Sequence, residues 1–484
     1  MSGLIYGFDE KKTVTIVDKT DPTVSVRIWF KAGAMDDPAG KEGLANLTAQ
    51  MLTEGGTAKK TYEQVIDNLY PMAAYYAANA SMEMTVFYGR VHKDNLEDYL
   101  AMFFEQLLTP GFRDEDFARI KQNNLNYLKT TLKYSNDEEL GKAVLYNNIF
   151  NNTPYGHIVS GTISGLDKIT LNDVKEFYTK YFNKNNFVLG IGGDIDDKLV
   201  QRVWEKLNQL PAGVENNFKD FPTPKISGKN VTIIEKKASA TAISIGFPVS
   251  FLRGSRDWYA LAIANSYLGE HRNSSSHLYQ VIREQRGLNY GDYSYIENFP
   301  NGGRLQLPPQ NVARNKQIFE IWIRPVPNET RHFSLRAALR ELKILVDNGL
   351  TKDQFELTRK FLKNYVLNFA TTTNERVAYA LDDKFYNISP GHLQNFREMM
   401  DELTLEAVNA AIKKHLQYDN MEIAFITQDA NGLKDALVKD TVSPISYSTP
   451  KSMEILEEDK SIISFPVKIK AENIKIKKVE ELFN

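Results

Sequence analysis

The order of the expected secondary-structure elements occurs twice along the chain. Apolar patterning in the first half predicts strands at 24–30, 82–88 and 187–193, and helices at 41–52, 96–108, 114–133, 140–151 and 171–182. The second half repeats this order, with strands at 231–235, 242–247, 317–324 and 422–426, and helices at 258–268, 331–347, 352–369, 374–387 and 404–416. The early strands lie about 218 residues apart, from Thr13 to Val231 and from Val24 to Ala242. Solenoid repeats are only about 20–50 residues long, so this period indicates a gene duplication and two domains of like fold.

Runs of strands followed by runs of helices predict the α+β class, with each domain a mostly antiparallel sheet and helices packed on one face. We expect a first domain at 1–215 and a second at 216–435, joined by a segment around 210–229 that is rich in proline and glycine. The segment 436–484 is then a C-terminal extension. Its alternating stretch Ile462–Ile469 favours an additional strand or an arm that contacts a partner.

Composition excludes several classes of function. The chain of 484 residues contains no cysteine, which removes disulfides, cysteine zinc sites, iron–sulfur clusters and cysteine nucleophiles. The net charge of −2 argues against a nucleic-acid partner. No apolar run reaches the ~20 residues that span a membrane. The printed start has no basic segment of a signal peptide, so the sequence leaves the bacterial periplasm and cytoplasm both open, and a trimmed signal would favour the periplasm.

One helix carries a pattern in which the residues expected to do chemistry have been replaced. The segment 30–57 contains a strand end, a Gly/Asp/Pro loop and Gly43-Leu44-Ala45 before a predicted helix. This segment resembles the insulinase/pitrilysin family of zinc peptidases, in which the helix bears His-x-x-Glu-His. Two His four residues apart share one helix face and bind one zinc, and the Glu between them activates a water. The matching positions here are Asn46, Ala49 and Gln50.

The resemblance therefore implies a chain without its own metal. Asn and Gln amides are poor zinc ligands beside imidazole, and alanine cannot act as a base. The family's third ligand is a Glu on a helix some seventy to eighty residues further on, yet 119–136 contains no Asp or Glu. We expect no cofactor in this chain. The fold that the resemblance implies is the LuxS/MPP-like metallohydrolase type, consistent with the two α+β domains.

Other segments extend the resemblance over about 13–429. Residues 76–88 resemble the family's edge strand, to which a peptide substrate adds as a further strand, and Asn79 is the candidate substrate-binding residue there. The alternative for Asn79 is plain sheet surface. Thr153-Pro154-Tyr155-Gly156 resembles the family's Pro-Tyr-Gly segment.

A second motif survives in the second half. Arg283-Glu-Gln-Arg-Gly-Leu-Asn-Tyr290 resembles the family's Arg-Glu-x-x-Gly-Leu-x-Tyr. In the family, this Arg binds a substrate carbonyl through its donor fork, and this Tyr donates to the developing oxyanion. The resemblance implies these catalytic roles for Arg283 and Tyr290, with Tyr279 as a candidate on the same substrate-binding wall. Arg286 is expected to be solvated, and the spacing of His271 and His277 argues against a metal site.

These observations predict a metal-free subunit that is not catalytic alone. A zinc-bearing subunit of the same family would form a heterodimer with it and cleave a peptide substrate, while Arg283 and Tyr290 act in trans. The alternative is a structural or peptide-binding relative with no role in catalysis. A self-sufficient hydrolase ranks last, because no Ser-His-Asp arrangement is visible.

Overall fold

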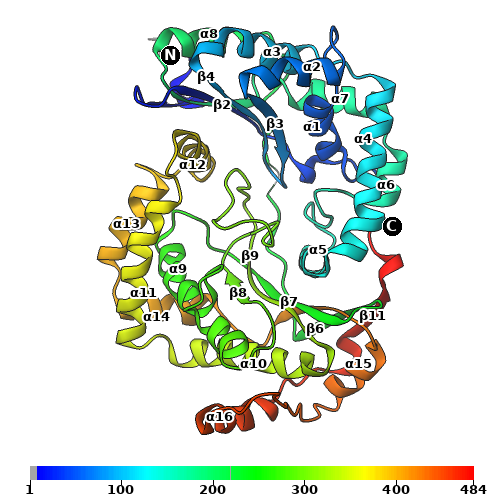
Figure 1. Cartoon of the computed structure of the whole chain (residues 1–484), viewed down its shortest axis with the longest axis vertical. Helices are drawn as coiled ribbons and strands as arrows, with labels where there is room; N and C mark the ends of the chain where they lie inside the picture. Colours follow the sequence, from blue (N-terminus) through cyan, green and yellow to red (C-terminus); the bar gives the residue numbers. More distant parts are fainter. Residues whose placement is uncertain (1–7, 219) are drawn as a thin grey trace.

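The computed structural model describes residues 8–218 and 220–484. Its strands form two sheets, which lie in the upper and lower parts of Figure 1. The first has the order β1-β5-β2-β4-β3 and the second the order β11-β6-β10-β7-β9-β8. Without β11, the two orders correspond strand for strand, and in each the outer parallel pair, β1 with β5 and β6 with β10, is followed by antiparallel neighbours. The predicted α+β fold with two like domains is confirmed.

The first domain contains five strands and eight α-helices among the described residues. The strands are β1 (Thr13–Val17), β2 (Thr23–Phe30), β3 (Tyr75–Ala80), β4 (Thr85–His92) and β5 (Phe187–Gly193). The helices are α1 (Leu44–Glu54), α2 (Tyr62–Leu69), α3 (Leu96–Leu108), α4 (Asp114–Asn126), α5 (Asp137–Ile149), α6 (Ile163–Lys168), α7 (Leu171–Tyr181) and α8 (Asp197–Leu207). The predicted helix 114–133 ends as α4 at Asn126 and continues as a wide π-type turn, Tyr127–Ser135. The predicted strand 82–88 starts only at Thr85, because 81–84 form the turn between β3 and β4.

The second domain and the C-terminal segment contain the other elements. The strands are β6 (Lys229–Glu235), β7 (Ala240–Val249), β8 (Asp292–Tyr295), β9 (Gln317–Pro327), β10 (Met421–Thr427) and β11 (Ile474–Lys478). The helices are α9 (Arg256–Gly269), the π-helix η6 (Tyr279–Glu284), α10 (Arg331–Asn348), α11 (Lys352–Tyr365), α12 (Thr373–Tyr386), α13 (His392–Glu402), α14 (Leu405–His415), α15 (Ala430–Val438) and α16 (Met453–Ile463). No helix of the described residues is long and apolar enough to cross a membrane.

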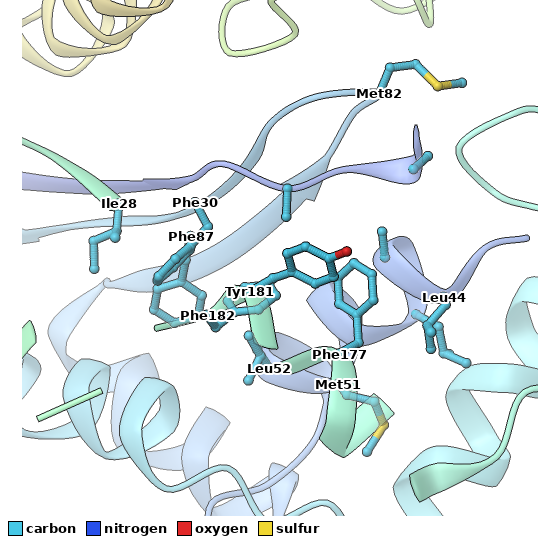
Figure 2. Packing of buried hydrophobic residues seen from close by; sticks show 14 of the residues in the cluster. Ile28, Phe30, Leu44, Met51, Leu52, Met82, Phe87, Phe177, Tyr181 and Phe182 are labelled. Atoms are coloured by element: carbon cyan, nitrogen blue, oxygen red, sulfur yellow. The ribbon is translucent and has the colours of Figure 1, made fainter. Parts of the chain in front are cut away.

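The core of the first domain lies between its sheet and helices α1 and α7 (Figure 2). Phe30 from β2 and Phe182 from the end of α7 pack with ring centroids 4.6 Å apart. Phe87 from β4 and Leu52 from α1 are fully buried beside them. Burial of each such side chain stabilises the fold by about 1.5–3 kcal/mol, so this layer fixes the position of α1.

Each sheet is also covered by one helix of the other domain. Helix α12 packs on β5, β1 and β2, and helix α5 packs on β7 and β10. Both helices lie in the space between the two sheets in Figure 1. Strand β2 is therefore buried on both faces: Val24, Val26, Ile28 and Phe30 enter the core, while Trp29 contacts Phe385 of α12 with ring centroids 5.5 Å apart.

Glycines in β5 allow this close approach. A Cβ at Gly192 would lie 2.6 Å from Val377 Cγ2, and one at Gly190 would lie 2.8 Å from Val377 Cγ1. The Gly190–Gly193 run that closes the first unit is thus a packing surface for α12. The two domains are interlocked by the exchange of α5 and α12.

The C-terminal segment joins both domains. The alternating stretch 462–469 is not a strand: α16 ends at Ile463, and the added strand is β11, parallel to β6. Residues Val479, Leu482 and Phe483 then enter the core of the first domain, and the Ile163 N–H donates to the Phe483 carbonyl over 2.6 Å.

Candidate functional site

Helix α1 is held at its start by a buried aspartate. The N–H groups of Gly43 and Ala45 donate to the two oxygens of Asp37, each over 2.7 Å. Burial raises the pKa of Asp37 well above its usual range, partly offset by these two donors. Gly43 has a φ of +106°, which only glycine adopts without strain. The loop therefore sets where the first turn of α1, and with it Asn46, is placed.

The positions that resemble zinc ligands carry amides that bond to one another. Asn46 and Gln50 lie on one face of α1, and Asn124 of α4 lies between them. The Asn46 amide donates to Asn124 Oδ1 over 3.1 Å, and Asn124 Nδ2 donates to Gln50 Oε1. Asn124 Nδ2 also donates to the Ile120 carbonyl over 2.9 Å. We call Asn46, Gln50 and Asn124 the amide triad.

The amide triad does not fit a zinc ion. All three groups are neutral, and zinc in proteins is held by thiolate, imidazole or carboxylate. The donor and acceptor atoms of Asn124 are already used within the triad. Ala49, at the position of the base, is buried and has no group that could take a proton. Within the described ranges, no cluster of three or more His, Cys, Asp or Glu residues could hold a metal.

Sequence reasoning missed Asn124. The absence of acids in 119–136 was visible, but no pattern in that stretch showed that Asn124 would bond to Asn46 and Gln50. The available signal was distance along the chain, because Asn124 follows Asn46 by 78 residues and Gln50 by 74.

A cavity of about 740 Å³ lies between the two domains next to the amide triad. The first domain contributes Asn46 and the β3 edge, including Asn79. The second domain contributes the loop that connects β8 to β9, from Asn298 to Arg314. Strand β3 is the last strand of its sheet and pairs only with β4 among the described strands. The structure thus brings Asn46 and Asn79 to one cavity.

The loop between β8 and β9 is fastened to the first domain. The backbone N–H and side-chain amide of Asn315 both donate to the Glu83 carboxyl, over 2.7 and 2.6 Å. Tyr155, of the predicted Pro-Tyr-Gly segment, also donates to Glu83. Burial raises the pKa of Glu83, and these three donors counteract that shift. Arg27 of β2 donates to Asn311 Oδ1 over 2.9 Å. The wall of the cavity is therefore fixed across the domain boundary.

Arg283 and Tyr290 lie elsewhere, on a surface of the second domain. Arg283 is the penultimate residue of η6, and Tyr290 lies two residues before β8. Tyr290 is 80% exposed, and its hydroxyl has no partner among the described residues. Within residues 8–218 and 220–484, Arg283 forms an ion pair only with its neighbour Glu284, over 3.0 Å, and its guanidinium lies 5.6 Å from the centre of the Tyr279 ring. Neither Arg283, Tyr290 nor Tyr279 lines the interdomain cavity.

Arg286 corrects the sequence prediction. It is not solvated but 3% exposed, and its guanidinium is bound by Asp459 and Glu458 of α16. The sequence could not indicate this, because the partners lie 172 and 173 residues away. His271 is also buried, with its ring nitrogens against the Tyr295 hydroxyl and the Leu305 carbonyl, and burial lowers its pKa to about 4. His277 pairs with Glu341 over 2.6 Å.

The fold is a two-domain α+β architecture, and amides stand at the positions of α1 that resemble the ligands of a zinc peptidase. Residues 12–163 match the family model "Insulinase (Peptidase family M16)", and residues 168–362 match "Peptidase M16 inactive domain". The chain therefore belongs to peptidase family M16.

Three relatives illustrate the match. A crystal structure from Pseudomonas fluorescens, described as a peptidase M16 inactive domain, has a TM-score of 0.76 and 25% identity, and the match covers 86% of this chain and 95% of that one. The non-peptidase homolog YmxG of Helicobacter pylori is 23% identical over 421 residues, 84% of this chain and 89% of that protein. An uncharacterized zinc protease of Rickettsia bellii is 27% identical over 338 residues, 69% of this chain and 79% of that protein. The relatives thus include inactive-domain and non-peptidase homologues.

Proposed function

We propose that this chain is the metal-free partner of a zinc-bearing M16 subunit, and that it supplies Arg283 and Tyr290 in trans to that subunit's active site. The observation that carries the proposal is a contrast in hydrogen bonding. Two hydrogen bonds link the three amides of the triad, whereas Tyr290 is exposed and its hydroxyl has no partner in the described part of the chain. Among the same residues, Arg283 forms an ion pair only with the adjacent Glu284 and lies near the Tyr279 ring. The exposed Tyr290 and the half-exposed Arg283 form no long-range hydrogen bond or ion pair with the described residues, so their polar groups are available to a ligand or partner.

The chemistry expected of each residue follows from its donors. The planar guanidinium of Arg283 presents paired N–H groups that can hold a substrate carbonyl in a fixed orientation. The Tyr290 hydroxyl can donate to the oxygen that becomes negative as the carbonyl is attacked. The zinc of the partner would supply the activated water. Tyr279, whose ring lies under Arg283, would limit the positions that the guanidinium can adopt.

Peptide binding is the second part of the proposal. Strand β3 has a free edge at which a peptide can form main-chain hydrogen bonds, and Asn79 is exposed on it. The cavity of about 740 Å³ beside that edge provides space for side chains. Peptide bound there would meet amides rather than a zinc-activated water, so this half of the chain would hold substrate without cleaving it.

The test mixes the full chain with a zinc-bearing M16 protein encoded in the same genome and measures cleavage of an internally quenched peptide. The mixture should cleave faster than the zinc-bearing protein alone. Tyr290→Phe should reduce that gain about 10²-fold, as expected for one oxyanion donor, and Arg283→Ala should reduce it as well. Tyr70→Phe, which removes the hydroxyl of another exposed tyrosine that does not line the cavity, should leave the gain in place. A mixture no faster than the zinc-bearing protein alone would instead favour the scaffolding alternative.

A further inference from the structure

Arg286 lies between the two residues that carry the proposed function, three residues after Arg283 and four before Tyr290. Its guanidinium is buried and uses all of its nitrogens. Nε donates to Asp459 over 2.8 Å, Nη2 to Glu458 over 2.9 Å, and Nη1 to the Val281 carbonyl over 2.7 Å. The last of these bonds ties Arg286 back to η6, the helix that carries Arg283.

The carboxylates that bind Arg286 belong to the C-terminal segment, and that segment fixes them. Asp459 Oδ2 accepts from the Tyr447 hydroxyl over 2.8 Å, while Glu458 Oε1 lies 3.2 Å from Arg340. The same segment contacts the end of η6 a second time, since Lys451 Nζ donates to the Gln285 carbonyl over 2.6 Å. The C-terminal segment therefore forms hydrogen bonds with two adjacent residues, Gln285 and Arg286, directly after the end of the helix that carries Arg283.

The other end of this stretch is fixed separately. Asn289 Nδ2 donates to Asp292 over 2.8 Å and to the Arg324 carbonyl over 3.0 Å. Between the two anchors, Gly287 has a φ of +70° and nothing stands within 4 Å of where its Cβ would be. The side chains of Arg283 and Tyr290 form no hydrogen bond that anchors this stretch among the described residues, although the Gly287 N–H donates to the Arg283 carbonyl over 2.7 Å. The side-chain bonds that hold the two ends of this stretch come from Arg286 and from Asn289.

We propose that Arg286, held by Asp459 and Glu458, is a positioning residue that fixes Arg283 and Tyr290 in the orientation their trans role requires. This gives the C-terminal segment a function and rests on the proposed function above. A side chain that must meet a transition state has to be held to within about 0.5 Å, which requires supporting bonds behind it. The buried arginine and its two carboxylates supply that support.

The test compares two buried arginines that both hold the C-terminal segment. Arg286→Lys keeps the charge but cannot reproduce three directed bonds. Arg336→Lys is the control: Arg336 donates to Ser443 over 3.0 Å and to Asp440 over 2.8 Å, and forms no hydrogen bond with 279–291 in the described part of the chain. Arg286→Lys and Arg336→Lys both weaken the attachment of the C-terminal segment, but only Arg286→Lys should alter the structure of the stretch from Arg283 to Tyr290. Asp459→Asn serves as a second variant from the carboxylate side.

Two readouts decide the matter. Amide hydrogen exchange of 279–291 should speed up about tenfold in Arg286→Lys and in Asp459→Asn, and stay unchanged in Arg336→Lys. In the mixture with the zinc-bearing protein, Arg286→Lys should lower kcat about tenfold with little change in KM or in subunit affinity. Combined with Tyr290→Phe, it should lower the rate by much less than the product of the two single losses.

The positioning role of Arg286 and the trans role of Arg283 and Tyr290 can fail separately. Unchanged exchange at 279–291 in Arg286→Lys, or losses that multiply fully with Tyr290→Phe, would overturn the positioning role while leaving the proposed function standing. If Arg283→Ala and Tyr290→Phe leave the gain intact, the proposed function fails, and the positioning role for catalysis fails with it.

Discussion

The two domains share a strand order but treat their functional positions in opposite ways. In the first, the three amides of the triad, two of them at positions that resemble zinc ligands, bond to one another. In the second, Tyr290 is exposed and Arg283 half-exposed, and the side-chain bonds that hold this stretch come from Arg286 and Asn289. Partly buried polar groups need hydrogen-bond partners, which the amides supply to one another, whereas an exposed motif can remain unpaired at little cost. The contrast separates residues retained for packing from residues available to a partner.

The largest effect should come from reversing the first half of this contrast. Asn46→His, Gln50→His and Asn124→Glu together restore two imidazoles four residues apart and a carboxylate within reach. We expect one zinc per chain by metal analysis after dialysis, and a gain of about 4 kcal/mol in unfolding free energy at free zinc a thousandfold above Kd.

The unmodified chain and Asn46→His alone are the controls, and both should stay free of stoichiometric zinc. Zinc bound at the amide triad of the unmodified chain would overturn the interpretation of that site. A triple variant that binds no zinc would mean that α1 and α4 no longer hold ligand geometry.

The exchange of helices between the domains can be tested next. Gly192→Ala places a Cβ 2.6 Å from Val377 and 2.9 Å from Thr373, which forces α12 away from β5. Overpacking of this kind lowers the free energy of unfolding by about 1–3 kcal/mol. We expect a loss near the upper end, about 3 kcal/mol, measured by denaturant unfolding. Gly303→Ala is the control, since its Cβ meets only Glu138 at 3.7 Å. Equal stability of the two variants would show that α12 does not depend on this close contact.

Most helices and strands could be predicted from the sequence, whereas the contacts that could not be predicted all join segments far apart in the chain. Local patterning located α3 at Leu96–Leu108 and α1 around Asn46, because helix and strand periods are properties of neighbouring residues. The partnership of Asn124 with Asn46 and the burial of Arg286 by α16 depend on segments more than 70 residues apart. The alternation in β2 likewise could not show that Trp29 and Arg27 lie beneath α12, a helix of the other domain.

A third test compares the acids at the ends of the corresponding helices α1 and α9. Desolvation raises the pKa of Glu270 to about 7, and hydrogen bonds with Ser266 and the His271 backbone offset only part of that shift. Burial also raises the pKa of Glu54, but the nearby positive charge of Arg119 partly offsets that shift. Because folded Glu270 holds its proton more tightly than the unfolded residue does, the free energy of unfolding falls as pH rises from about 4.5 to about 7.

Glu270→Gln should remove most of that slope. Since the residue as a whole is only half-buried, we expect the variant to be about 2 kcal/mol more stable than the unmodified chain at pH 8 and nearly equal to it at pH 4.5. Glu54→Gln should give a smaller change over the same range. Urea unfolding at several pH values measures both, and a slope that survives Glu270→Gln would assign the pH dependence to another group.

The smallest expected effect isolates the second half of the contrast. Tyr290→Phe removes a hydroxyl that has no partner in the described structure, so the free energy of unfolding should change by less than about 0.5 kcal/mol. Tyr155→Phe is the matched change in a buried tyrosine: it deletes a donor to Glu83 and should cost about 2 kcal/mol, since the desolvated carboxyl loses a hydrogen bond. If Tyr290→Phe proved as destabilising as Tyr155→Phe, the hydroxyl would have a structural task, and its exposure would no longer argue for a partner. If the Tyr290→Phe chain is fully stable yet fails to accelerate the zinc-bearing protein, the Tyr290 hydroxyl acts in the cleavage reaction and not in the stability of the fold.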